Sequence, residues 1–388
     1  MRILQINAVP YGSTGAMMFA LADALEQEGH QVLCTAGFTW KKSDREDFFL
    51  TSTLPEKAAH ILLAKLTGRI GCFSIPATLR LLRKMDQFRP DVANLHNLHG
   101  WFVNIPLLIT FLRRREIPVV WTLHDCWAFT GHCPHFDALG CEKWKTGCHD
   151  CPQYRAYPGT FFDCSRAMYR VKKRWFSNWS NLTLVTPSAW LKGKVEESFL
   201  QGTPVQVIPN GVDTYLFHPA ASPAGEKYRI LGVAYHWNEK KGLDTFLQLA
   251  ELLGDAYEIT LAGACPEGIP TTIRTLGPVN SRETLAKLYA GADVFVNPTL
   301  EDNFPTVNLE ALACGTPVIT YATGGSPEML DETCGSVVPK GDVMALAAEI
   351  RRVCEERPYT KENCRRRSRD FTPEAMVETY MELYRSKL

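Results

Sequence analysis

Short β-rich apolar runs alternate with stretches of helical spacing along almost the whole chain, and this alternation restricts the fold more than any other feature. Strands separated by helices are typical of a parallel sheet that is covered on both faces. The first series of expected strands comprises Arg2–Asn7, Gln31–Thr35, Asp91–His96, Pro118–Leu123, Leu182–Thr186 and Val205–Ile208. A second series comprises Tyr228–Ala234, Ile259–Gly263, Asp293–Asn297 and Pro317–Thr320, before a helix at Val343–Glu355.

The two series predict two doubly wound α/β domains. The chain has 388 residues, which suits two domains of ordinary size. We expect the first domain at 1–213, with a Cys-rich insert at 125–159, and the second at 228–370. The polar, Pro- and Gly-rich stretch 214–227 is the expected linker. Ligands bind at the carboxyl ends of such strands, so the active site is expected in a cleft between the domains.

Composition excludes several classes of protein. Lys and Arg number 42 and so do Asp and Glu, and 45% of the residues are hydrophobic. A disordered chain and a whole-chain nucleic-acid binder are therefore excluded. No apolar run approaches the roughly 20 residues of a membrane-spanning helix, and the first residues do not form a signal peptide. We therefore expect a cytoplasmic protein.

Two glycine motifs each carry weak information when taken alone. Gly12 to Gly15 follow a strand and precede a helix expected at 16–27, where backbone amides can approach a phosphate. A purely structural turn explains them equally well. Asn210 and Gly211, in the run 209–213, form a tight-turn pair whose interest lies in its place at the end of the first domain.

A third motif lies between residues 302 and 317. The loop 297–305 follows a strand, Thr306 is expected to cap a short helix, and Gly315 is expected to end it. Asp302 in the loop and Glu310 about one turn into the helix then lie beside a helix start that favours an anion. Such an arrangement suits recognition of sugar or ribose hydroxyls. A solvated acidic loop followed by a helical Glu is the equally simple structural alternative.

Together these motifs resemble those of the family 4 retaining glycosyltransferases of the GT-B fold. That pattern has a glycine loop after the first strand, N-G-V-D near the domain junction, Lys-Gly in the second domain and an E-x7-E block before A-C-G-T-P-V. Here it corresponds to 12–15, Asn210–Asp213, Lys241-Gly242 and Asp302–Val318, in that order. The resemblance covers nearly the whole chain. It also implies that the terminal helix, at 371–388, returns to the N-terminal domain.

The resemblance implies a role for each matching residue. Gly12 and Gly15 would face the donor diphosphate, Lys241 would neutralise the departing phosphate, and His124 would lie beside the transferred sugar. Asp302 would contact sugar hydroxyls and Glu310 the ribose. The remaining donor-binding positions are Tyr235, Val279 (beside the base), Asn303, Phe304, Pro305 and Thr306.

The chain departs from the family pattern at two positions. Asp302 stands where the family usually has Glu, and Glu301 is one place out of register. Tyr235 stands six places before Lys241, where Arg is usual. Lys241 would then carry phosphate neutralisation, assisted by Lys240. No catalytic metal is expected, because a good leaving group needs mainly charge stabilisation.

Other polar residues at strand ends are candidates for the acceptor side. These are His96, His99 and Asp125, of which Asp125 directly follows His124. Turn-forming or satisfied strand-end roles are the alternative for the histidines. The basic runs 113–115 and 170–174 suggest contact with an anionic membrane surface, although solvated helix faces explain them more simply.

The Cys-rich insert contains four cysteines with one close pair, at Cys133, Cys141, Cys148 and Cys151. Four soft ligands in a reducing compartment suit a structural zinc ion. Free thiols packed with aromatic residues, or disulfides in an oxidising compartment, are the alternatives.

We therefore expect a glycosyltransferase that moves a sugar, with retention, from a nucleotide-diphosphate donor to a saccharide or lipid-linked saccharide. Surface-polysaccharide assembly is the setting that the resemblance implies. The alternatives are a GT-B sugar-nucleotide 2-epimerase and a non-catalytic, zinc-organised sugar-nucleotide-binding protein.

Overall fold

The strands of the computed structural model form two parallel sheets, one of seven strands and one of six. The structure describes residues 1–40, 45, 47–221 and 225–388. Contacts divide this part of the chain into two units. The first contains Met1–Phe136, Gly140–Ile208 and Val377–Leu388, and the second contains Asp137–Leu139 and Pro209–Met376. The contacts place 209–213 with the second unit, whereas the expected first domain included these five residues. Residues 222–224 of the expected linker lie outside the described residues.

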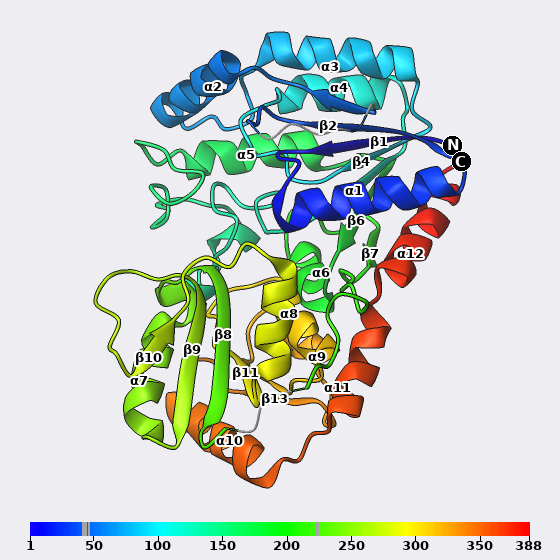
Figure 1. The fold of residues 1–388 in the computed structure, drawn as a ribbon. Coiled ribbons are helices and arrows are strands. Elements are labelled where there is room, and N and C mark those ends of the chain that lie inside the picture. Colours follow the sequence, from blue (N-terminus) through cyan, green and yellow to red (C-terminus); the bar gives the residue numbers. More distant parts are fainter. Residues whose placement is uncertain (41–44, 46, 222–224) are drawn as a thin grey trace. The chain divides into compact units, whose positions relative to one another are not determined.

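The sheet of the first unit has the strand order β3-β2-β1-β4-β5-β6-β7. Its strands are β1 (Arg2–Asn7), β2 (Gln31–Ala36), β3 (Phe48–Leu50), β4 (Val92–Leu95), β5 (Val119–Thr122), β6 (Leu182–Thr186) and β7 (Val205–Val207). Its helices are α1 (Gly12–Gln27), α2 (Leu54–Thr67), α3 (Ile75–Phe88), α4 (Ile105–Arg114), α5 (Ser165–Phe176) and α6 (Ala189–Glu196). Figure 1 shows α1 on one side of this sheet and α3 and α4 on the other. The direction of strand addition reverses between β1 and β4, where ligands of such folds bind.

The sheet of the second unit has the strand order β10-β9-β8-β11-β12-β13. Its strands are β8 (Tyr228–His236), β9 (Tyr257–Ala264), β10 (Ile273–Thr275), β11 (Val294–Asn297), β12 (Val318–Tyr321) and β13 (Gly335–Val338). The helices that follow are α7 (Leu243–Leu253), α8 (Arg282–Gly291), α9 (Thr306–Ala313), α10 (Val343–Glu356), α11 (Lys361–Ser368) and α12 (Pro373–Arg385). The order of strand addition reverses here between β8 and β11.

Alternating side chains of the second sheet explain why both its faces are covered. Val294 and Val296 of β11 pack into one apolar cluster with α7 and α10, whereas Phe295 between them packs into another with α8 and α9. Successive side chains of a strand point to opposite faces, so a strand that is apolar at every position requires cover on both.

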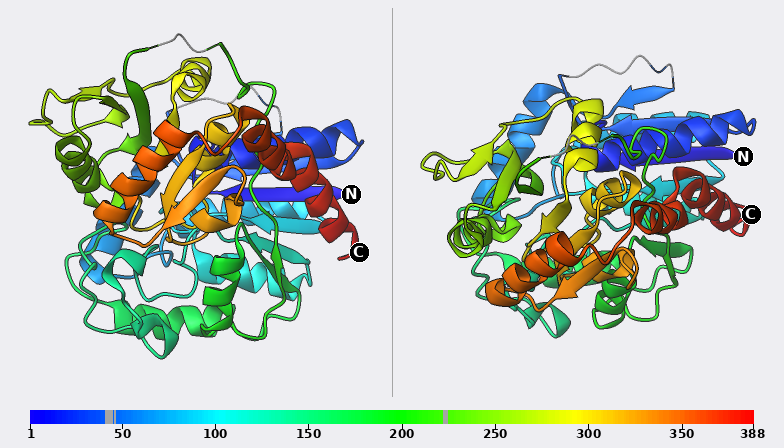
Figure 2. Two further views of the ribbon diagram at one scale, coloured as in Figure 1. Left: turned by 90° about the horizontal axis from the view of Figure 1, so that it is seen from below. Right: turned by 60° about the horizontal axis from the view of Figure 1, so that its bottom comes forward.

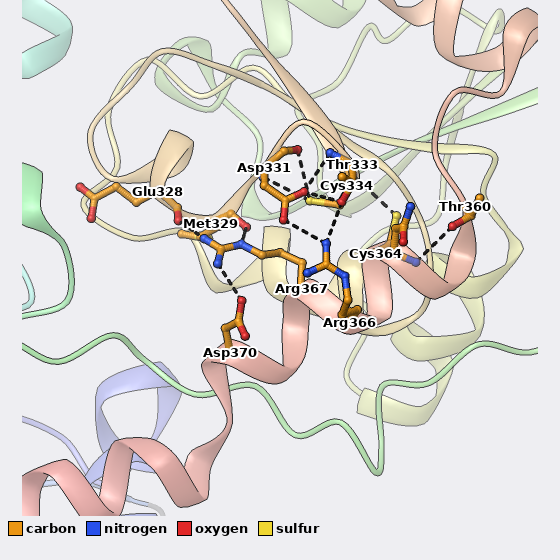
Figure 3. Close-up of polar contacts among 11 residues, drawn as sticks. Glu328, Met329, Asp331, Thr333, Cys334, Thr360, Cys364, Arg366, Arg367 and Asp370 are labelled. Carbon is orange, nitrogen blue, oxygen red and sulfur yellow. Dashed lines mark hydrogen bonds and ion pairs between the residues drawn. The ribbon is translucent and has the colours of Figure 1, made fainter.

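The last two helices belong to different units: α11 packs in the second unit, and most of α12 packs in the first. In the second unit, Arg367 of α11 donates hydrogen bonds to the carbonyl oxygens of Met329 and Glu328, at 3.1 and 2.7 Å. Figure 3 shows this arginine beside Arg366, whose guanidinium lies 3.0 Å from the Thr333 hydroxyl. In the first unit, the Tyr380 hydroxyl of α12 lies 2.9 Å from that of Thr122. Figures 1 and 2 show the chain ending beside the N-terminal strand.

None of the helices in the described residues combines the length and apolar character that a bilayer crossing requires.

Candidate active site

The candidate residues of the first unit follow the carboxyl ends of three neighbouring strands. The glycine segment follows β1, His96 follows β4, and His124 follows β5. Because β1, β4 and β5 are adjacent and parallel, these ends share one edge of the sheet.

The glycine segment forms the first turn of α1, so the expectation of a loop ahead of a helix at 16–27 is wrong. Gly12 is the first helical residue and has a φ of +70°, which glycine adopts without strain. A Cβ added at Gly15 would lie 2.4 Å from the carbonyl carbon of Pro10. The Thr14 hydroxyl accepts a hydrogen bond of 3.2 Å from Asn7 at the end of β1. Only glycine at position 15 lets the helix begin this close to the strand.

His96 and His124 are joined by a hydrogen bond, and amide side chains surround His96. Nδ1 of His96 lies 3.0 Å from Nε2 of His124, and Nε2 of His96 lies 3.0 Å from the amide oxygen of Gln5. The amide nitrogen of Asn94 lies 3.2 Å from the same Nε2, and an amide nitrogen only donates, so these two neighbours favour opposite tautomers of His96. The Gln5 amide nitrogen is oriented in turn toward the Tyr384 hydroxyl of α12, at 3.5 Å.

Burial keeps both histidines neutral. It lowers the pKa of His124 to about 4, against a smaller opposing effect of Asp125. It lowers the pKa of His96 well below its ordinary value. At neutral pH His124 is therefore a hydrogen-bonding group without a charge.

The structure brings the predicted acceptor-side residues together. Nε2 of His99 lies 3.3 Å from a carboxylate oxygen of Asp125, and the His99 ring stacks on Trp127 with ring centres 5.2 Å apart. One small pocket is lined by His96, His99, His124 and Asp125.

Replacing Gln5 with leucine should disturb the orientation of His124 without removing it. The variant Gln5→Leu removes the amide oxygen that lies 3.0 Å from Nε2 of His96, so the ring that hydrogen-bonds to His124 loses one of its polar contacts. We expect kcat to fall about tenfold, the effect of about 1.4 kcal/mol, with KM for the donor nearly unchanged. Gln5→Glu, which keeps an accepting oxygen, is the matched control and should retain most of kcat. Equal losses in both variants would contradict the orienting role.

In the second unit, Lys241 follows β8 and is held against the loop after β11. Gly242, with a φ of +80°, approaches so closely that an added Cβ would lie 2.3 Å from the Pro298 carbonyl oxygen. The Lys241 ammonium then lies 2.8 Å from Asp302. Lys240 makes a separate ion pair of 2.5 Å with Glu301, which is buried. The predicted phosphate-binding lysine and sugar-binding carboxylate are therefore neighbours.

The expected cap of α9 is wrong. Thr306 is the first helical residue, Pro305 precedes it as the N-cap, and the cap makes no side-chain hydrogen bond. Instead, Asn297 at the end of β11 donates a hydrogen bond of 2.8 Å to Asn308 within the helix. Phe304 is buried, so its side chain belongs to the core and only its backbone can serve a ligand.

Glu310 is a buried carboxyl group with one hydroxyl partner. The Tyr289 hydroxyl donates a hydrogen bond of 2.9 Å to it. Burial raises the pKa of Glu310 to about 7, although Tyr289 and Arg282 both act to lower it. Near neutral pH this carboxyl group therefore exists in both protonation states.

Three other predicted donor residues have less definite surroundings. Tyr235 is 86% exposed, and its ring packs edge-on against His236. Val279 is half-buried beyond β10. Asn303 is buried in the loop before α9. Their proposed contacts with a donor remain predictions.

Sequence reasoning missed the loop after β12. A Cβ at Gly324 would lie 1.6 Å from the carbonyl oxygen of Asp302, so the two loops meet backbone to backbone. The pair Gly324-Gly325, a few residues after a strand, was the available signal. Gln5 and Tyr289, which hold His96 and Glu310, carry no motif that would have revealed them.

The Cys-rich insert contains a hydrogen-bonded pair of thiols. Cys133 donates to Cys151, which lowers the pKa of Cys151 to about 7 and, with burial, raises that of Cys133. Cys148 accepts a backbone hydrogen bond of 3.1 Å from Gly131. The described residues contain no group of three or more His, Cys, Asp or Glu side chains arranged to hold a metal ion, so Cys141 does not complete a ligand set. The structural zinc stays a prediction, which metal analysis of protein purified without chelator would check.

One residue of each basic run makes hydrogen bonds within the first unit. Arg113 donates to the carbonyl oxygens of Trp175 and Ser177, both at 3.0 Å. Lys172 is fully buried and donates a hydrogen bond of 2.7 Å to the Trp127 carbonyl oxygen. The expectation of a wholly solvated face is therefore wrong for Lys172.

Comparisons with known proteins agree with this arrangement. A model of glycosyltransferase family 4 matches residues 14–216, and a model of the group 1 glycosyl transferases matches residues 227–356. The putative colanic acid biosynthesis glycosyl transferase WcaC of Escherichia coli K12 is 26% identical over 313 residues, which are 76% of each chain.

Solved structures show the same fold. Sucrose-phosphate synthase of Thermosynechococcus elongatus superposes with a TM-score of 0.72 at 19% identity, over 99% of this chain and 98% of that one. Anabaena HepE, solved in complex with UDP, superposes with a TM-score of 0.67 at 15% identity over both whole chains. The chain belongs to glycosyltransferase family 4 and is a glycosyltransferase of the GT-B fold.

Proposed function

We propose that this glycosyltransferase transfers a sugar, with retention, from a nucleotide-diphosphate donor to a saccharide or lipid-linked saccharide in surface-polysaccharide assembly. The observation that carries the donor assignment is the second unit's combination of the Lys241–Asp302 pair with the buried Glu310. An ammonium group suits a diphosphate, and carboxylates suit sugar and ribose hydroxyls. The similarity to WcaC, named for colanic acid biosynthesis, supports the setting.

The proposed chemistry rests on stabilising the departing diphosphate. Lys241 exchanges its partner Asp302 for the developing phosphate charge, and Asp302 then accepts from sugar hydroxyls. Backbone amides at the start of α9 add a favourable partial charge. Neutral His124 is suited to hydrogen bonding with the transferred sugar. We assign no general base, because the leaving phosphate is itself able to take the acceptor's proton.

We also propose that the protein works in the cytoplasm, in part at the inner face of the membrane. A lipid-linked acceptor would place the reaction there. The comparisons favour neither the 2-epimerase nor the non-catalytic alternative, since the named relatives cited above are transferases or synthases.

The test is a thermal-shift assay with UDP, GDP, ADP and CMP. At about 100 times the dissociation constant, a ligand adds about 2.7 kcal/mol to the free energy of unfolding, which moves Tm by several degrees. We expect one nucleotide to shift Tm strongly, and its sugar derivatives then form the set for a transfer assay with saccharide acceptors. No shift with any nucleotide would contradict every sugar-nucleotide function.

A further inference from the structure

Helix α2 of the first unit has its apolar side facing outward. Only His60 and Ala64 of this helix are buried. At 100° per residue, the direction opposite to this pair is occupied by small and large apolar side chains. They are Ala58, Ala59, Leu62 and Leu66, with Lys65 beside them and Leu63 on the flank of the helix. Leu62 is 56% exposed and Leu66 is 49% exposed.

Further exposed apolar residues adjoin this face. The backbone amide of Phe161 donates a hydrogen bond of 3.0 Å to the Lys65 carbonyl oxygen, which places Phe161 and Phe162 beside the end of α2. Phe162 is 64% exposed. At the start of α2, Lys57 donates to the Phe38 carbonyl oxygen, and the ring of exposed Trp40 packs on Phe38. Figure 1 shows α2 at the outer edge of the first unit.

An ordinary surface helix has the opposite pattern, with its apolar stripe toward the core. Soluble proteins rarely expose contiguous apolar patches, and those that exist mark interaction sites. We call the patch formed by Leu62, Leu63, Leu66, Phe161 and Phe162 the α2 face.

The charges around the α2 face indicate which kind of surface it binds. Lys65 and Arg69 are exposed at its margin. Glu56, the one acidic residue of α2, is already paired with Arg80, which holds its pKa at about 2.

Asp163, next to Phe162, is exposed as well, and it accepts hydrogen bonds from the backbone amides of Cys151 and Ser165. The margin therefore carries two cations against this one carboxylate. Two copies of the chain packed through this face would bring like charges together, whereas an anionic bilayer offers phosphates for the cations and an acyl boundary for the leucines.

We propose that the α2 face is the surface by which this enzyme docks on anionic membranes. The proposal deepens the peripheral location proposed above and rests on it. It locates contact at α2 and 161–162, where exposed cations adjoin exposed apolar side chains. Leucines enter the boundary of the bilayer while Lys65 and Arg69 stay at the level of the headgroups.

The test is co-sedimentation of the full chain with vesicles of phosphatidylethanolamine and phosphatidylglycerol, compared with vesicles of phosphatidylcholine alone. Wild-type protein should bind the anionic vesicles and release in high salt. Leu62→Gln/Leu66→Gln should lose about tenfold or more in vesicle affinity, because two apolar anchors are removed. Met344→Gln/Leu388→Gln, which changes two exposed apolar residues outside the face, is the matched control and should bind like wild type.

A second variant tests the charge. Lys65→Glu/Arg69→Glu should also lose about tenfold or more on anionic vesicles, since each cation near such a surface contributes about 1 kcal/mol. Unchanged vesicle binding in both variants, or no binding by wild type, would overturn the proposal. Sedimentation velocity provides a further check. If the wild-type protein self-associates and Leu62→Gln/Leu66→Gln abolishes that self-association, the proposal is also overturned. The nucleotide thermal shift should be the same in every variant, so failure here is distinguishable from failure of the proposed transferase function.

Discussion

Replacing Lys241 with alanine is expected to lower kcat by about 100-fold or more. Charge accumulates on the departing diphosphate in the transition state, and one preorganised donor at such a site contributes a factor of about 100 to 1,000. The Lys241 ammonium lies 2.8 Å from Asp302, beyond the carboxyl ends of β8 and β11 in the second unit. Steady-state kinetics with the donor identified by thermal shift measure the change.

The free energy of unfolding should barely respond to the same change. The Lys241 side chain is 39% exposed, and exposed ion pairs of this kind contribute at most about 1 kcal/mol. Lys240→Ala is the matched comparison. Lys240 was expected to assist Lys241, but its ammonium is paired with the buried Glu301 instead. This variant should keep kcat within a few-fold of wild type. A Lys241→Ala variant that unfolds would show that this lysine is structural, and equal losses in both variants would contradict a position-specific role.

Much of the fold follows from local patterns. The alternation of apolar runs and helical spacing locates the central strands of both sheets, because these strands are buried on both faces and are therefore mostly apolar. Missed strands such as Phe48–Leu50 are short edge elements that leave little pattern. The pairing of Lys241 with Asp302 could be anticipated, since both follow strands whose carboxyl ends share one edge of the sheet.

Other properties of the site depend on tertiary surroundings that spacing does not contain. Thr306 has the residue type of a cap, yet Pro305 holds that position, and Asn297 anchors the helix from outside. Lys172 lies in a basic run but is buried against Trp127. The ring of His96 is held by a contact with Gln5, which is distant in sequence. Burial, which determines the protonation of Glu310, is likewise a property of the assembled unit.

Glu310→Gln is expected to weaken nucleotide binding by about 10- to 100-fold at alkaline pH. A carboxylate accepts from both ribose hydroxyls, and hydrogen bonds to a charged group contribute about 1.5–3 kcal/mol. With its pKa raised to about 7, the wild-type group becomes a full acceptor only above neutrality. Wild-type affinity should therefore increase as the pH rises through 7, whereas that of the variant should not. Titration calorimetry across this range measures both.

The free energy of unfolding should fall as the pH rises, whereas the nucleotide affinity should increase. The folded state holds a proton on Glu310 up to about pH 7, whereas the unfolded chain releases it near the ordinary value of 4.5. Between these values the folded state binds more protons, so its free energy of unfolding falls as the pH rises, by up to about 3 kcal/mol. The loss is complete above the folded-state pKa. Glu310→Gln has no such proton and should become the more stable protein at alkaline pH.

The two effects of this one substitution test each other. If Glu310 is the ribose ligand, the variant gains stability at alkaline pH while it loses nucleotide affinity, because a buried carboxylate is costly until hydroxyl donors satisfy it. Glu310→Asp, which keeps the charge on a shorter side chain, should recover the pH dependence of stability but only part of the affinity. Unchanged nucleotide affinity in Glu310→Gln, together with the gain in stability, would mean that the buried carboxyl group lies outside the ribose site.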